Sequence, residues 1–416
     1  MKRFAFSAVA VACGCFATTA SAQNSVTLYG IVDFGIDYLS NVQTGQGPNG
    51  PRGHSAVLVE DGSTGGFQSS RWGILGTEDL GGGLSTIFRI ESGFSVANGS
   101  ITQGGLLFGR QVYVGLSSRQ YGTLTLGRQY DVLSTYLGQF LSVTKWGGYM
   151  ASHPGGDLDN TYSTRRINNA IKYISADYNG FTFGGLYSLS GVAGNPGRNQ
   201  AYSVGANYAQ GPLVLAVAYS NQRNPNFSYF GTNGGAATSV TGNNLGSAGS
   251  ATSAESNPVV AGYASASTLQ TIAAGVSYTF GNATVAGTYS NLQLRGLGNT
   301  AASGPNPFGY KGNVTFNTGE VNLSYQFTPA LYGGIAYMYM RNSGSADGPD
   351  GATYQQFNIG AVYSISKRTA FHVTAVYQHA KGTDSLSQPA VAMLSGQTPS
   401  ATPNQIGVSI GMRHSF

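Results

Sequence analysis

Short segments in which apolar and polar side chains alternate recur along the whole chain. In the first, residues 25–38, one face carries Asp33 and Asp37. The opposite face is apolar and carries Val26, Leu28, Val32, Phe34, Ile36 and Tyr38. A period of two residues is typical of a β-strand. Fifteen similar segments follow, so the pattern predicts sixteen strands: 25–38, 69–80, 84–94, 107–118, 121–130, 166–178, 181–190, 200–210, 213–222, 269–280, 283–294, 314–327, 330–341, 353–365, 370–381 and 404–416.

The connections between these segments alternate between short and long. The short ones, such as Asn179-Gly180 and Gly211-Pro212, use residue types that favour tight turns. The long ones are polar and fall near 39–68, 95–106, 131–165, 191–199, 223–268, 295–313, 342–352 and 382–403. The stretch 231–268 has the composition of a flexible linker. Because the strand pattern resumes unchanged after it, we interpret it as one long surface loop.

Composition narrows the fold class further. Glycine accounts for 62 of 416 residues and charged residues for only 9%, too little charge for an ordinary soluble surface. Apolar runs are too short for membrane-spanning helices. We therefore predict an all-β protein: a transmembrane, antiparallel, up-and-down β-barrel of sixteen strands with long external loops and short periplasmic turns. A barrel of this size leaves an aqueous channel, and tyrosine and phenylalanine should form girdles at both interfaces. A secreted β-solenoid would show a fixed short repeat, which the sequence lacks.

The N-terminal segment has the features of a secretory leader. Lys2 and Arg3 precede a short apolar run, which ends in an A-x-A cleavage site at residues 20–22. This predicts a signal peptide over 1–22 and a single barrel domain over 23–416. Both cysteines lie in the leader, so the mature chain would have neither disulfides nor thiolate metal ligands.

Enzymatic, metal and nucleic-acid functions are disfavoured. Gly407–Gly411 matches G-x-S-x-G but lies within a strand, whereas a nucleophile elbow needs a strand–turn–helix context. Gly45–Gly50 matches G-x-G-x-x-G but contains a proline and opens no helix. His372 and His379 are seven residues apart and so lie on opposite faces of a strand. The mature chain would carry 19 basic and 16 acidic residues, too even a balance for nucleic-acid binding. We expect no enzyme activity, cofactor or metal.

The last predicted strand alternates up to its final residue, Phe416. Because terminal residues of soluble proteins are usually frayed, this pattern indicates that the last strand pairs directly with the first.

Several of these segments resemble the trimeric general porins of Gram-negative outer membranes. The resemblance lies in Ser25–Asp33, Ser70–Leu84, Arg110–Leu116, Gly122–Tyr130 and the terminal Phe416. It implies a sixteen-stranded barrel, a homotrimer and passive diffusion of small hydrophilic solutes and ions. It also implies a third loop, about 131–165, folded into the lumen, and a role for Phe416 as the signal read by the outer-membrane insertion machinery. Outer-membrane lipid and lipopolysaccharide are the further partners that it implies.

In the resembling family, wall arginines face acidic groups of the third loop across a constriction. The matching positions here are Arg71, Arg128 and either Arg165 or Arg166, with Asp157 and Asp159 as the loop acids. Arg128 has the parity of outward Leu124 and Leu126, so we expect Gly127 to permit a bulge or a local bend that redirects it. Further candidates for lining the pore are Asp33, Arg89, Glu91 and Lys172.

The constriction candidates, three basic residues against two acidic ones, predict slight anion preference at best, because the contribution of Asp33 to the wall charge is uncertain. Enteric family members carry a basic residue where this chain has Ile31. Two alternatives to a general porin stay open: a solute-specific outer-membrane channel and a barrel adhesin or surface protein. A specific sugar channel would line its path with stacked aromatics, whereas the third loop offers little beyond Lys145, Trp146 and Tyr149.

Overall fold

The computed structural model describes residues 24–47, 50–63, 65–190, 193–194, 196–197, 200–225, 257–300, 303, 306–348 and 350–416. The predicted leader and the segment 226–256 of the long loop lie outside these residues. Within them, one antiparallel sheet contains the strands β1 (Ser25–Gly47), β2 (Gly50–Glu60), β3 (Arg71–Gly81), β4 (Leu84–Gly93), β5 (Gln111–Ser118), β6 (Gly122–Tyr130), β7 (Arg166–Ile174), β8 (Phe181–Ser188), β9 (Ala201–Gln210), β10 (Leu213–Arg223), β11 (Thr268–Phe280), β12 (Ala283–Leu297), β13 (Gly312–Gln326), β14 (Leu331–Asn342), β15 (Ala352–Ser364), β16 (Thr369–Gly382) and β17 (Asn404–Ser415).

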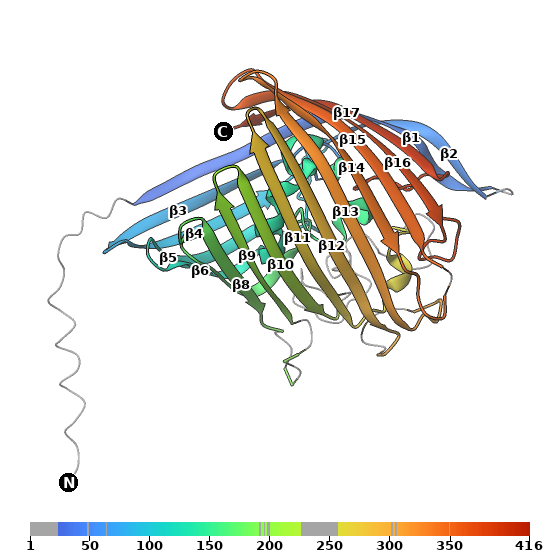
Figure 1. Cartoon of the computed structure of the whole chain (residues 1–416), viewed down its shortest axis with the longest axis horizontal. Helices are drawn as coiled ribbons and strands as arrows, with labels where there is room; N and C mark the ends of the chain where they lie inside the picture. The colour runs from blue at the N-terminus through green and yellow to red at the C-terminus, as the bar shows by residue number, and fades with distance from the viewer. Residues whose placement is uncertain are drawn as a thin grey trace, which may run out of the picture.

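The sheet closes on itself between the first and last strands. β17 pairs with β1 over Ile31–Leu39, and β1 pairs on its other edge with β3 over Ser25–Ile31. Every other neighbouring pair follows chain order, so the described strands other than β2 form a closed barrel of sixteen (Figure 1). The predicted fold class and strand number are confirmed. At the seam, the backbone N–H groups of Gly30 and Phe416 each donate to the other residue's carbonyl at 3.1 Å.

Side chains alternate between the two faces of the wall. On β1 the predicted apolar face is exposed, whereas Asp33 and Asp37 are fully buried and point inward. Exposed aromatic side chains lie toward both ends of the outer wall. On the turn side they include Tyr278, Phe280, Tyr325, Phe327, Tyr363 and Phe371, and on the loop side Tyr289, Tyr337, Tyr339, Phe357 and Tyr377. The placement agrees with two interfacial girdles.

The first long connection differs from the sequence prediction. Residues 39–68 were expected to form a polar loop, but β1 continues to Gly47 and β2 returns beside it. The two strands pair from Gly35↔Glu60 to Gly47↔Gly50, with register shifts on the way. The physical reason is that pairing satisfies the backbone groups of both strands beyond the barrel rim, and the β-branched Val57 and Val59 favour strand in the second half of β2.

The connection 131–165 contains short helical segments rather than irregular chain. They are α1 (Val132–Leu137), η1 (Gly138–Phe140), η2 (Val143–Gly147), η3 (Tyr149–Ala151) and α2 (Pro154–Asp157). A second buried cluster lies beneath the other long loops, where η5 (Ala261–Tyr263) packs against side chains such as Leu294 and Phe316. No helix among the described residues is both long and apolar enough to cross a membrane.

Candidate functional site in the channel

Residues 131–165 lie inside the barrel, held by inward side chains of distant strands. The backbone N–H of Ser142 donates to Glu320 of β13 at 2.7 Å, and the Trp146 indole donates to Ser324 at 3.0 Å. Asn358 of β15 donates to the carbonyl of Ala151 at 3.2 Å. The loop therefore narrows the space that the sixteen strands enclose.

The loop enters the barrel through α1. Asp131 caps this helix by accepting from the backbone N–H of Leu133, and its other carboxylate oxygen accepts from Ser220 of β10 at 2.8 Å. The apolar face of α1 packs on small inward residues such as Ala218 and Ala273. Lys172, a predicted lining residue, supports this turn: its ammonium donates to the Tyr130 carbonyl at 3.0 Å and to Thr135 at 2.8 Å.

A group of charged side chains and one tyrosine, here called the wall cluster, lies on the inner face of β3 to β7. Its members are Arg71, Glu91, Arg110, Arg128, Tyr130 and Arg166. Glu91 is the acidic centre: its carboxylate lies 2.7 Å from the Arg110 guanidinium and 3.7 Å from that of Arg71. It also accepts from the Tyr29 hydroxyl at 2.7 Å. The side chain of Arg71 is 23% exposed, so it offers more charge to the lumen than the buried Arg110, Arg128 and Arg166.

Arg128 reaches this cluster at an irregularity in the pairing of β6 and β7. Gly127 has φ +138°, and the β6–β7 register shifts between Gly127 and Gln129. The extra residue belongs to β7, where Asn168 and Asn169 together oppose Arg128. The guanidinium donates to the Gly109 carbonyl at 2.7 and 2.9 Å and to Asn168 at 2.6 Å. Arg128 is thereby buried, despite the outward parity of its neighbours on β6.

The two consecutive arginines at the start of β7, Arg165 just before it and Arg166 as its first residue, lie in different environments. Arg166 donates to the Tyr130 hydroxyl at 3.2 Å, and its guanidinium lies 5.0 Å from the centre of that ring. Tyr130 also accepts from Arg110 at 2.9 Å, so Arg166 belongs to the wall cluster. Arg165 turns into the loop and donates to the Leu158 carbonyl at 2.5 Å.

Both predicted loop acids have hydrogen-bond partners, Asp157 within the loop and Asp159 in the loop and on the barrel wall. Asp157 accepts from the backbone N–H groups of Tyr162 and Thr164 at 2.9 and 3.1 Å. Asp159 lies 2.8 Å from His153 and accepts from Ser290 of β12 at 2.5 Å. Both carboxylates are almost fully buried. Burial and the adjacent Asp159 charge raise the pKa of Asp157 to about 6.

His153 connects the loop acids to the far wall. Its Nδ1 lies 2.8 Å from Asp159, and its Nε2 lies 3.3 Å from Glu320 of β13. Burial disfavours its charge, but the two carboxylates outweigh burial and hold the pKa of His153 well above 6.5. Burial alone would raise the pKa of Asp159. The charge and hydrogen bond of His153 outweigh burial and hold the pKa of Asp159 below its usual range. We call His153, Asp159 and Glu320 the loop clamp.

The remaining predicted lining residues lie apart from this clamp. Arg89 stacks over Tyr29, with 5.5 Å between its guanidinium and the ring centre. Asp33 is fully buried, 3.3 Å from His372 of β16, and pairs in register with Arg413 of β17. The seam thus has charged groups of its own beside β1.

Sequence reasoning missed Arg110, His153 and Glu320. A signal for Arg110 was present, because Gly-Arg-Gln occurs at 109–111 and again at 127–129, around Arg128. Both copies stand at the loop ends of adjacent strands. His153 and Glu320 are 167 positions apart in the sequence, and only barrel closure brings them together.

The geometry of the wall cluster suits selection of passing ions by their charge rather than catalysis of a reaction. Four guanidinium groups and one carboxylate gather on one side of a narrowed lumen, and charged rings in a pore select ions by sign. Among the described residues, no group of three histidine, cysteine or acidic side chains could hold a metal ion.

Comparison with known proteins agrees with this architecture. The family model for the Gram-negative porin matches residues 7–383. An outer membrane porin protein of Bordetella pertussis is 38% identical over 221 residues, which is 49% of this chain and 56% of that protein. Outer membrane porin protein 32 of Delftia acidovorans is 33% identical over 220 residues, with the same two coverages. The chain thus spans about half the length of the curated relatives that it matches.

Solved structures share the fold over nearly the whole chain. An anion-selective porin from Comamonas acidovorans has a TM-score of 0.68 at 22% identity and covers 95% of this chain and 100% of its own. The trimer form of OmpT from Vibrio cholerae has a TM-score of 0.56 at 15% identity, with coverages of 94% and 99%. Together with the closed barrel and its narrowed lumen, the family match shows that this chain belongs to the Gram-negative porin family and is a multi-strand β-barrel protein of the outer membrane.

Proposed function

We propose that the protein is a water-filled channel for passive diffusion of small hydrophilic solutes and ions across the outer membrane. The observation that carries the proposal is the wall cluster inside a closed barrel that residues 131–165 narrow. A packed interior would exclude charge unless it were paired, whereas this lumen keeps four arginines against Glu91 alone within that cluster. No catalytic step is needed for this function, so we propose no enzymatic activity.

We further propose that the working form is a homotrimer, which the likeness to a trimeric solved barrel supports. Phe416 is proposed as the signal read by the barrel-insertion machinery. Outer-membrane lipid, including lipopolysaccharide, and the permeating solutes complete the proposed partners. The leader 1–22 is proposed to be removed before assembly.

The charge balance of the wall cluster favours anions. Its four arginines exceed Glu91 by three positive charges. The loop acids expected to oppose them are buried: Asp157 is hydrogen-bonded within the loop, and Asp159 is bonded to His153 and to Ser290 of the wall. This balance supports a firmer anion preference than the sequence alone predicts. The solved relative from Comamonas acidovorans is itself described as anion-selective.

Solute permeability of liposomes tests the proposed function. Vesicles that contain the purified protein should admit unrelated small solutes, such as a neutral amino acid, a pentose and a hexose, at rates that fall smoothly with solute size. Protein-free vesicles are the control. Uptake of one solute class with exclusion of others of equal size would instead establish a solute-specific channel.

A further inference from the structure

Two tyrosine rings of the third loop stack on each other inside the barrel, near the wall cluster. Tyr149 of η3 and Tyr162, which follows α2, have ring centres 6.0 Å apart and ring planes inclined by 26°. Both residues are partly exposed. Because residues 131–165 lie inside the barrel, this exposed ring surface faces the lumen. We call the two rings the tyrosine pair.

Backbone hydrogen bonds fix the tyrosine pair in place. The N–H of Tyr162 donates to the Asp157 carboxylate at 2.9 Å, and the N–H of Tyr149 donates to the carbonyl of Gly66, between β2 and β3, at 2.8 Å. Neither bond involves a phenol group. The rings are thus positioned before any solute arrives, which lowers the cost of ordering them around one.

The positive charge of the wall cluster reaches the tyrosine pair. Burial raises the pKa of the Tyr162 hydroxyl, whereas the charges of Arg110 and Arg71 act on the same pKa in the opposite direction. The two guanidinium groups are therefore close enough for their field to act at the end of this ring. An aromatic surface and a cationic surface adjoin each other in the lumen.

Two hydrogen-bond donors of the wall cluster are left over at this place. The Tyr130 hydroxyl accepts from Arg110 at 2.9 Å and from Arg166 at 3.2 Å, which uses both of its lone pairs and leaves its proton to donate. One terminal nitrogen of Arg71 donates to a backbone carbonyl at 3.0 Å, and the other is left over. In the described part of the chain, neither leftover donor has an acceptor. Both residues are partly exposed, so an anion in the lumen can reach them.

We propose that the lumen contains a binding site for small aromatic carboxylates, such as benzoate. The carboxylate accepts from Arg71 and from the Tyr130 hydroxyl, and its ring packs against the tyrosine pair. Two features select this class of solute. A guanidinium fork matches the geometry of a carboxylate, and an aromatic ring gains more on tyrosine than a saturated ring does. The site rests on the proposed channel function and names a solute class that the passage favours.

Three probes of nearly equal size separate the contribution of the ring from that of the charge. Benzoate has both, cyclohexanecarboxylate has the charge without the aromatic ring, and benzamide has the ring without the charge. Saturation-transfer NMR titrations of the full-length protein in neutral detergent give the dissociation constants, with protein-free micelles as the blank. Benzoate should bind about twofold to tenfold more tightly than cyclohexanecarboxylate, as aromatic stacking predicts. Benzamide should bind more weakly than benzoate.

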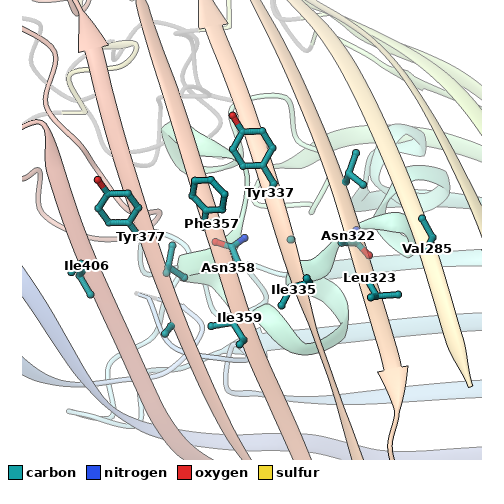
Figure 2. Close-up of a pocket in the computed structure, with 14 residues that line it drawn as sticks. Val285, Asn322, Leu323, Ile335, Tyr337, Phe357, Asn358, Ile359, Tyr377 and Ile406 are labelled. Carbon is teal, nitrogen blue, oxygen red and sulfur yellow. The ribbon is translucent and has the colours of Figure 1, made fainter.

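Variants assign each contribution to a residue. Tyr162→Leu keeps an apolar side chain but removes a ring, so it should abolish the preference for benzoate over cyclohexanecarboxylate. Tyr162→Phe should retain that preference, because the ring stacks without its hydroxyl. Arg71→Gln should weaken both carboxylates and leave benzamide unchanged. Tyr337→Leu is the control and should match the wild type, since Tyr337 is exposed on the outer wall, where Figure 2 shows it beside Phe357.

Single-channel conductance in potassium chloride is recorded on the same preparations. The site is disproved if the wild type binds the two carboxylates equally, if Tyr162→Leu keeps the preference, or if Arg71→Gln leaves benzoate affinity unchanged. A wild type that conducts without any preference keeps the channel function and loses the site. Selective benzoate binding without conductance would contradict the channel function and leave the site intact. Should Tyr162→Leu fail to assemble, Tyr149→Leu makes the same comparison.

Discussion

Neighbouring groups decide what each charged residue of the lumen does. Arg165 and Arg166 are adjacent in sequence, yet one donates to a loop carbonyl and the other to the Tyr130 hydroxyl. Asp157 organises a turn, whereas Asp159 pairs with His153. Formal charge alone therefore does not identify the groups that a passing ion meets. Arg71, the most exposed arginine of the wall cluster, is the strongest candidate.

We predict that Arg71→Ala lowers the anion-to-cation permeability ratio by about twofold to fivefold at low salt, because one unit charge a few ångströms away contributes on the order of 1 kcal/mol in water. The effect should shrink as salt shortens the screening length below about 8 Å. Reversal potentials across a salt gradient measure it. Arg128→Ala should shift the ratio in the same direction.

Arg52→Ala is the matched control, since Arg52 lies on the exposed β2 strand beyond the barrel. If neither Arg71→Ala nor Arg128→Ala moves the reversal potential at low salt, the wall cluster is not the constriction.

The sequence predicted most of the wall cluster but not its internal pairing. The family resemblance pointed to Arg71, Glu91 was a further lining candidate, and the repeated Gly-Arg-Gln could have added Arg110. The burial of Asp159 was not predictable, because it depends on Ser290 and, through His153, on Glu320 of distant strands. Such contacts form only after the barrel has closed.

At the scale of elements, periodicity was a good guide to strands and a poor guide to connections. The sixteen barrel strands all coincide with alternating segments. β2 was missed because glycine and proline stand in its first four residues, where pairing with β1 overrides weak local preference. The helices within 131–165 are short, and packing of α1 against inward alanines such as Ala218 and Ala273 stabilises that helix.

The loop clamp should give the protein a pH-dependent stability. The stabilisation from the raised pKa of His153 is fully present below pH 6.5 and is lost as the pH rises through that raised value. The stabilisation from the lowered pKa of Asp159 is present above pH 3.8 and is lost as the pH falls through the lowered value. His153→Gln should therefore cost about 3 kcal/mol near neutral pH, because it leaves buried carboxylates unpaired. Thermal unfolding followed by circular dichroism across pH measures this difference.

His54→Gln, an exposed histidine of β2, is the control and should change stability little. A difference between His153→Gln and wild type that stays constant into alkaline solution would rule out a protonated His153 as the source of the stabilisation.

At the scale of the whole molecule, closure depends on one short seam. The β17–β1 ladder ends with the paired backbone bonds between Gly30 and Phe416. The Phe416 ring covers Gly30 so closely that a Cβ there would lie 2.3 Å from it. Glycine at position 30 therefore accommodates the terminal ring.

We predict that deletion of Phe416 reduces the amount of protein inserted in the outer membrane several-fold more than it changes the conductance of the molecules that do insert. The reason is that the deletion removes the last ladder contacts between β17 and β1, whereas the side chains of the wall cluster are carried by β3 to β7 and their flanking residues. Membrane fractionation and single-channel recording measure the two quantities. Ser415→Ala, which keeps the length and the ladder, is the control; normal insertion of the truncated chain would refute the prediction.

The loop that narrows the lumen also has a mechanical consequence. A hollow cylinder yields most easily by flattening, and a strut across its interior opposes that deformation. Residues 131–165 touch β10 through Asp131, β13 through Ser142 and β16 through the Trp146 carbonyl. The cross-section is thereby braced at widely separated points of its circumference. The opening should keep its shape when lateral tension in the surrounding membrane changes. The size limit for permeating solutes should therefore not depend on membrane tension.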